Sequence, residues 1–283
     1  MTGITQGPTQ RGRMVVLLAA LLTSYAVLGA CATPPSGKSD VNLVAIVSDV
    51  ADAHRAQLVG LLAEQSLLPE GFAYHSATTT EPEVDAYSEP ASDAELVMTF
   101  PRISAFGYDP TTFGVIGETR DAQGKAWLHV RIPPLGLEPA ANGTSAWVRA
   151  ADVEITGHDA ELRIDLSERT LALVDGGETV SEWTVGIGKP GSRTPTGEFF
   201  LWTKWLPEQG SHPAYGAGVL AVNAVSEDLP SWQGGAPLIG IHGSSRTSDL
   251  GAAISNGCVR MSNESLQQLL DTLPLGTRVA VVA

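Results

Sequence analysis

The sequence predicts a mostly β protein in which a small β module precedes a larger β domain that carries one helix. Its 283 residues include 30 glycines and 18 prolines, a composition that favours turns over long helices. From residue 95 onward, short runs of alternating apolar and polar residues are separated by turn residues. From residue 158 onward, only the segment that begins at Ser262 and ends near Pro274 has a capping residue followed by helical periodicity.

Residues 1–30 have the organisation of an export signal. Arg11 and Arg13 precede an uncharged apolar run, residues 14–28, which is shorter than the ~20 residues that span a membrane. We expect a signal peptide, with an uncleaved membrane anchor as the alternative. The Leu-Gly-Ala-Cys ending at Cys31 resembles the lipobox of bacterial lipoproteins. This resemblance implies a lipid on the Cys31 sulfur and an extracytoplasmic protein, anchored to the cell membrane and facing the cell wall.

Residues 31–94 are expected to form a tether, a short helical segment and an acidic linker. Ser48 can cap a helix whose apolar stripe continues until Pro69 ends it. Residues 78–93 are rich in Thr, Ser, Pro and acidic residues and contain little that could be buried. We therefore predict that residues 78–93 are a linker to the β module that follows.

Residues 95–155 are predicted to form a small β-barrel or sandwich. The segments around Trp127 and Trp147 resemble bacterial SH3-like modules, which often accompany enzymes of the cell wall. Both tryptophans could stack on carbohydrate, but their apolar neighbours favour a place in the core. Asn142-Gly-Thr matches an N-glycosylation acceptor, and we interpret it as a turn instead. The expected strands are residues 96–100, 112–119, 126–132 and 145–148.

Residues 156–283 are predicted to form the second β domain. Asp175-Gly-Gly between two alternating runs indicates a β-hairpin. Ser262 is expected to cap the helix, which presents leucines at helical spacing. The expected strands are residues 162–166, 171–174, 179–185, 198–205, 219–225, 238–241 and 279–282.

The charge of the chain excludes some classes of partner. With 31 acidic and 17 basic residues, the formal net charge is −14. A phosphate backbone would be repelled by such a surface, so we expect no nucleic-acid binding.

The two cysteines of the sequence suggest that Cys258 is a nucleophile. If Cys31 carries a lipid, Cys258 has no partner for a disulfide. A single free thiol in an exported protein indicates nucleophilic chemistry as the first role to test. A thiol is mostly protonated at neutral pH and needs a neighbouring imidazole to become a thiolate. His242, sixteen residues earlier at the end of an apolar strand, is the obvious partner. Gly243 and Gly257 leave space for a substrate and for a sharp turn. A buried thiol beside a core histidine is the alternative.

Two other readings of these residues are weaker. A zinc site would use His242, Cys258, His212 and Asp249, but the paired ligands at short spacing that closed zinc sites show are missing from the sequence. Papain-like peptidases place the cysteine before the histidine, whereas here the order is reversed. We therefore expect neither a metal nor a cofactor.

Three motifs occur in the order and spacing of the L,D-transpeptidase (YkuD) catalytic domain, which the chain resembles over residues 158–283. They are Arg193-Thr-Pro-Thr-Gly-Glu-Phe, Ile-Gly-Ile-His-Gly ending at Gly243, and Ser255-Asn-Gly-Cys-Val-Arg. The resemblance implies a β-sandwich enzyme that remodels peptidoglycan. Such enzymes attack the third residue of a donor tetrapeptide stem, expel the terminal D-alanine and hold a cysteine thioester. The side-chain amine of an acceptor stem then takes the acyl group, which gives a 3→3 cross-link. Carbapenem-type β-lactams are the implied inhibitors.

The resemblance also implies roles for the catalytic residues. Cys258 is the nucleophile, and His242 is the general base that later protonates the leaving amine. We expect the Gly243 carbonyl to orient His242 through its other ring nitrogen. The N–H groups of Gly257 and Cys258 could face a developing oxyanion.

Four further residues are expected to contact the substrate: Tyr215, Arg260, Ser255 and Asn256. Tyr215 lies in a glycine-rich stretch suited to a lid. The planar fork of Arg260 suits a donor carboxylate, with a solvated surface arginine as the alternative. Many family members have a histidine where this chain has Asn256, which would make the domain slow if that histidine were the base. We favour His242 as the base, with Asn256 making hydrogen bonds that shape the loop.

Two alternative functions stay open. If water replaces the acceptor amine, the same residues make an L,D-carboxypeptidase. If the domain has lost its activity, the chain is a wall-binding lipoprotein.

Overall fold

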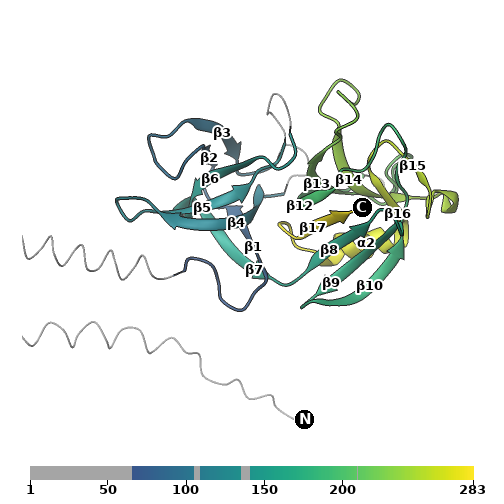
Figure 1. The fold of residues 1–283 in the computed structure, drawn as a ribbon, viewed down its shortest axis with the longest axis horizontal. Coiled ribbons are helices and arrows are strands. Elements are labelled where there is room, and N and C mark those ends of the chain that lie inside the picture. The colour runs from purple at the N-terminus through teal and green to yellow at the C-terminus, as the bar shows by residue number, and fades with distance from the viewer. Residues whose placement is uncertain (1–65, 105–108, 135–140, 209) are drawn as a thin grey trace, which may run out of the picture. The chain divides into compact units, whose positions relative to one another are not determined.

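The computed structural model describes residues 66–104, 109–134, 141–208 and 210–283. The predicted signal peptide, the expected lipidation site at Cys31 and the helix expected after Ser48 lie outside the described residues. Within the described ranges, no helix is long and apolar enough to cross a membrane. Two large β-sheets dominate the described chain, as Figure 1 shows.

The first sheet is antiparallel throughout, and its strands follow the order β3-β2-β6-β5-β4-β1-β7. Alternate residues face a core that includes Phe113, Leu128, Val130 and Val148, all fully buried. All strands expected between residues 96 and 148 are confirmed. The strands are β1 (Tyr74–Thr79), β2 (Glu83–Tyr87), β3 (Leu96–Pro101), β4 (Thr112–Arg120), β5 (Ala126–Arg131), β6 (Ser145–Arg149) and β7 (Val153–His158), with a 3-10 turn at Ala150–Asp152.

The linker prediction for residues 78–93 is wrong, because β2 and the end of β1 belong to this sheet. Val84 and Ala86 are fully buried, whereas Glu83 is exposed. The acidic residues that suggested a linker therefore occupy the outward positions of a short alternating strand. The first module thus extends from β1 to β7, residues 74–158, instead of 95–155.

The two tryptophans of the first module differ in burial. Trp127 is fully buried, and its Nε1 donates to Asp121 at 3.0 Å, which confirms the core interpretation. Trp147 is only partly buried and stacks on His129 with ring centroids 4.5 Å apart, so it lies outside the core. The predicted turn at Asn142 is confirmed. The likeness of this module to SH3-like domains stays a prediction.

The second sheet has the order β10-β9-β8-β17-β12-β13-β14-β16. Two of its pairs, β17 with β8 and β14 with β16, are parallel. The strands are β8 (Glu161–Asp165), β9 (Thr170–Asp175), β10 (Glu178–Thr184), β12 (Gly197–Trp205), β13 (Val219–Val225), β14 (Leu238–Ser244), β16 (Val259–Ser262) and β17 (Arg278–Val282). A separate parallel ladder joins β11 (Ile187–Gly188) to β15 (Ala253–Ser255), and a 3-10 turn covers Thr247–Asp249.

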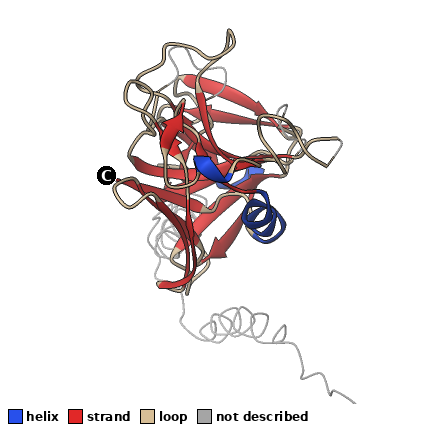
Figure 2. Cartoon of the chain, turned by 90° about the vertical axis from the view of Figure 1, so that its right-hand side faces the viewer, coloured by secondary structure: helices blue, strands red, loops and turns tan. Residues whose placement is uncertain are grey.

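The local predictions for this domain are confirmed. Gly176 and Gly177 have φ values of +57° and +85° between β9 and β10, as a tight hairpin turn requires. Helix α2 (Asn263–Thr272) follows β16 directly, and the Ser262 side chain accepts a hydrogen bond from the Ser265 N–H. Figure 2 shows α2 against the strands, where its leucines are buried in the core of the second sheet.

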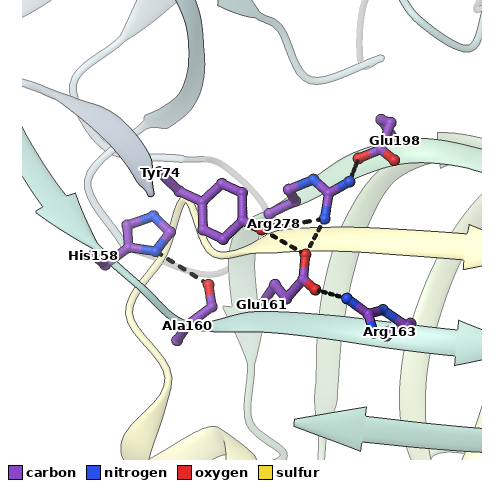
Figure 3. A network of polar contacts seen from close by, with 7 residues as sticks. All are labelled: Tyr74, His158, Ala160, Glu161, Arg163, Glu198 and Arg278. Carbon is purple, nitrogen blue, oxygen red and sulfur yellow. Dashed lines mark hydrogen bonds and ion pairs between the residues drawn. The ribbon is translucent and has the colours of Figure 1, made fainter. Parts of the chain in front are cut away.

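A polar network joins the first module to the second sheet (Figure 3). Glu161 is 2% exposed and accepts from the Tyr74 hydroxyl at 2.8 Å and from Arg163 at 2.5 Å. Arg278 pairs with both Glu161 and Glu198. Burial alone would raise the pKa of Glu161, but the Tyr74 hydrogen bond and the two arginines outweigh it and lower the pKa. The carboxylate is therefore ionised inside the interface between the two sheets.

Candidate active site

The parallel register of β14 and β16 brings His242 and Cys258 together. His242 pairs with Arg260 in this register, and Cys258 comes one residue before β16 begins. Since residues two apart on a strand face the same side, Cys258, Arg260 and His242 project from one face of the sheet. The side chains of Cys258 and His242 line the same two cavities. The predicted juxtaposition of these two residues is thus present.

One ring nitrogen of His242 is fixed by the backbone. The imidazole is 3% exposed, and its Nδ1 lies 3.0 Å from the Gly243 carbonyl, the contact expected from the sequence. A carbonyl oxygen only accepts, so Nδ1 carries the proton and Nε2 keeps a free lone pair. Burial lowers the pKa of His242, the Gly243 hydrogen bond opposes this shift, and the Arg260 charge adds to it. His242 is therefore a neutral imidazole that can accept a proton through Nε2.

Cys258 is a free, partly exposed thiol. Its Sγ lies 3.9 Å from the Leu238 carbonyl on the neighbouring strand. Burial raises the pKa of the Cys258 thiol, although the backbone at Gly240 and the Arg260 charge act in the opposite direction. The resting pair is thus a neutral thiol beside a neutral imidazole.

The turn before the nucleophile requires a glycine at position 257. Gly257 has a φ of +118°, and a Cβ there would lie 2.8 Å from Ile239 Cδ1. The expected oxyanion role of the Gly257 N–H is wrong, because this group donates to the Ser255 Oγ at 3.1 Å. Among the described residues, no acceptor is found for the Cys258 N–H, whose expected oxyanion role stays a prediction.

Ser255 braces the turn and also lines the Cys258 cavity, so its predicted contact with a substrate stays a prediction. It is 1% exposed, and its hydroxyl donates to the Cys258 carbonyl at 2.5 Å while accepting from Gly257. Thr194 supports the same turn from another segment, since its Oγ1 donates to the Gly257 carbonyl at 2.8 Å and accepts from the Gly188 N–H at 3.0 Å. Sequence reasoning missed Thr194, although it lies inside the Arg193 motif.

Asn256 lines the cavity that contains Cys258. The loop-shaping hydrogen bonds expected from its side chain are not found with any described residue. Ser255 and Thr194 supply these bonds instead, so Asn256 is a wall residue of the cavity.

Arg260 is held in place and is not a freely solvated surface residue. Its Nη1 lies 3.0 Å from Asp249 Oδ2, which also accepts from the Ser244 hydroxyl at 2.7 Å. Burial would raise the pKa of Asp249, but these two hydrogen bonds and the Arg260 charge outweigh it and lower the pKa. The buried Nε of Arg260 has no hydrogen-bond partner among the described residues. Arg260 borders both the Cys258 cavity and a polar cavity of about 370 Å³ that Arg246 also lines.

The catalytic pair opens into two adjoining cavities of about 140 and 370 Å³. Tyr215 lines both, and its ring meets His242 edge-on with centroids 5.3 Å apart, so the structure places it where the sequence expected it. His212 stacks on Tyr215 at 5.2 Å and acts as a loop residue. Trp232, which sequence reasoning missed, also lines both cavities and is 42% exposed. Within the described ranges, no three His, Cys, Asp or Glu side chains gather as metal ligands would.

Comparison with known proteins gives a consistent result. The protein-family model of the L,D-transpeptidase catalytic domain (YkuD) matches residues 159–281 of this chain. A Bacillus licheniformis protein named "Putative L,D-transpeptidase YkuD" is 31% identical over 170 residues, which cover 58% of this chain and 94% of that protein. The YqjB protein of Bacillus subtilis, named in the same way, is 30% identical over 115 residues, which cover 39% of this chain and 64% of that protein.

Solved structures with the same description also resemble the chain. An L,D-transpeptidase from Mycobacterium smegmatis matches with 17% identity and a TM-score of 0.37, covering 71% of this chain and 99% of that one. L,D-transpeptidase 3 from Mycobacterium tuberculosis, solved with a faropenem-derived adduct, matches with 13% identity and a TM-score of 0.38, covering 56% of this chain and 91% of that one.

Proposed function

The chain belongs to the L,D-transpeptidase family, and we propose that it forms 3→3 cross-links between peptidoglycan stem peptides through a cysteine thioester. The observation that carries this proposal is the shared cavity of Cys258 and His242, in which the Gly243 carbonyl holds the imidazole in one tautomer. A lipid on Cys31 would anchor the enzyme at the outer side of the cell membrane.

In the first step, Cys258 Sγ attacks the carbonyl carbon of the third residue of a donor tetrapeptide. His242 Nε2 takes the thiol proton as the C–S bond forms, so the two neutral groups become a nucleophile and an imidazolium. The imidazolium then gives this proton to the leaving amine as the C–N bond breaks and D-alanine departs. The fixed Nδ1–H hydrogen bond to Gly243 keeps the ring oriented through both transfers.

The developing oxyanion is expected to bind the Cys258 N–H. The Ser255 and Thr194 hydrogen bonds hold the turn on both sides of this peptide group, so the donor is preorganised. One such donor typically contributes about 3 kcal/mol of transition-state stabilisation.

In the second step, the side-chain amine of an acceptor stem attacks the thioester carbonyl. His242 takes a proton from this amine and returns it to the departing Cys258 sulfur, which restores the neutral pair. If water attacks instead, the product is a tripeptide and the enzyme acts as an L,D-carboxypeptidase.

Arg260 is the proposed anchor for a donor carboxylate. Its Nη1 is paired with Asp249, which fixes the guanidinium group, and the residue borders the Cys258 cavity. Because Arg246 lines the adjacent polar cavity, a carboxylate there would meet two guanidinium groups.

The test is mass spectrometry of muropeptides incubated with the purified protein. We expect a product that joins two stems with loss of one D-alanine, and no product from a Cys258→Ser variant. Free tripeptide alone would indicate the carboxypeptidase. Intact mass after incubation with a carbapenem should increase by one adduct on Cys258, and the absence of both product and adduct would identify an inactive wall-binding protein.

A further inference from the structure

The side-chain amide of Asn142 joins the first module to β13 of the second sheet. Its Oδ1 accepts a hydrogen bond from the Val225 N–H at 2.7 Å, and its Nδ2 donates to the Val225 carbonyl at 3.0 Å. Nδ2 also lies 3.1 Å from the Glu227 carboxylate. Asn142 therefore uses both ends of its amide on the backbone N–H and carbonyl of one residue, as a neighbouring β-strand would.

Val225 needs this partner because β12 does not reach it. On the β12 side, the ladder with β13 extends only from Val219 to Val222, while Leu238 of β14 pairs with Val225 from the opposite edge. Val225 is 4% exposed, so without Asn142 its N–H and carbonyl would be buried without partners.

The residues after Val225 form the wall of the active-site cavity. The loop of residues 226–237 is closed at its base by the Ser226 N–H, which donates to the Pro237 carbonyl at 2.8 Å. Four of its residues border the cavity that holds the Cys258 thiol. They are Leu229, Trp232, Gln233 and Pro237.

Arg193 holds the same loop from the other side. Its guanidinium donates to Asp228 at 2.9 and 2.7 Å, and its N–H donates to the same carboxylate at 2.8 Å. These hydrogen bonds lower the pKa of Asp228 to about 2. The loop therefore has two anchors near its first residues, Asn142 and Arg193, while its tip at Trp232 is exposed.

We infer that Asn142 is a positioning residue of the active site, through which the first module fixes the 226–237 loop over Cys258. The module thereby shapes the cavity without contacting the substrate. The catalytic consequence rests on the proposed function, whereas the effect on the loop follows from the contacts alone.

The test compares Asn142→Ala with the full-length wild type in three measurements. Hydrogen–deuterium exchange in residues 226–237 should become faster, because the base of the loop loses an anchor. Acylation by a carbapenem should slow about tenfold, because the cavity wall no longer holds the reacting carbonyl in place. Alkylation by iodoacetamide should stay unchanged, since this small reagent needs only the thiol.

Tyr74→Phe is the matched control, because it removes a hydrogen bond to Glu161 from the contact between the same two sheets but touches no residue of the loop. It should change neither the loop exchange nor the acylation. Equal loop exchange in both variants would overturn the inference, as would faster exchange with unchanged acylation. If the wild type itself is not acylated, the proposed function fails, and the exchange comparison still decides whether Asn142 holds the loop.

Discussion

His242 is the one side chain on which both proposed proton transfers depend. We expect His242→Ala to slow acylation of Cys258 by at least ~100-fold, because a positioned general base typically contributes that much or more. Asn256→Ala should retain most of the activity, since Asn256 only lines the cavity and an amide exchanges no proton at neutral pH. Intact-mass kinetics with a tetrapeptide or a carbapenem measure both rates. The reverse ranking would show that the residue at position 256 participates in the chemistry.

For single residues, the spacing of the motifs predicts the nucleophile and its base but not the hydrogen bonds that hold them in place. Cys258 and His242 are predictable because a thiol needs an imidazole and a glycine-rich turn. The bracing role of Ser255 is not predictable, because a serine hydroxyl beside a nucleophile suits a substrate equally well. The Arg260–Asp249 pair joins strand β16 to the 3-10 turn at Thr247–Asp249. Only the fold determines that these two side chains meet.

Among the elements, the segment before β12 supports the nucleophile turn through Thr194. Thr194→Val keeps the shape of the side chain but leaves the Gly257 carbonyl and the Gly188 N–H without partners. A buried unpaired group costs ~1–3 kcal/mol, so we expect acylation about tenfold slower or a comparable loss of stability. Thr196→Val is the control, since Thr196 is exposed in the same motif. Stopped-flow acylation and thermal unfolding measure the two effects, and identical behaviour of both variants would contradict the bracing role.

Strand periodicity predicts most elements of both sheets, and its failures have physical causes. The β2 segment is only five residues long, and its acidic outward positions resemble a linker when its neighbours in the sheet are unknown. The short parallel strands β11 and β15 were not predicted, because two or three residues give no measurable alternation. The loop of residues 226–237 carries no motif, so its place at the cavity follows only from tertiary contacts.

For the whole molecule, Glu161 links the two sheets as a buried carboxylate. Its pKa is lower in the folded than in the unfolded state, so its contribution is present above the unfolded pKa and is lost as the pH falls through the folded pKa. Glu161→Gln should therefore reduce the free energy of unfolding by about 2 kcal/mol at neutral pH. The difference from wild type should shrink near pH ~3.

Urea denaturation at the two pH values measures this difference. Glu198→Gln is the matched control, because Glu198 pairs with the same Arg278 but its side chain is 56% exposed. The Glu198→Gln substitution should reduce the free energy of unfolding by less than about 1 kcal/mol, as for other solvated ion pairs. A Glu161→Gln effect that does not change with pH would contradict the ionised state of this carboxylate.

The position of β17 has a consequence for how the second domain is made. This strand follows all other strands of its sheet in the sequence, yet it lies between β8 and β12 and joins the two halves of the sheet. Synthesis proceeds from the N-terminus, so neither half finds its central neighbour until residues 278–282 have been added. The sheet is therefore completed only after translation has delivered its final strand, and a chain stalled before Arg278 presents two unpaired edges.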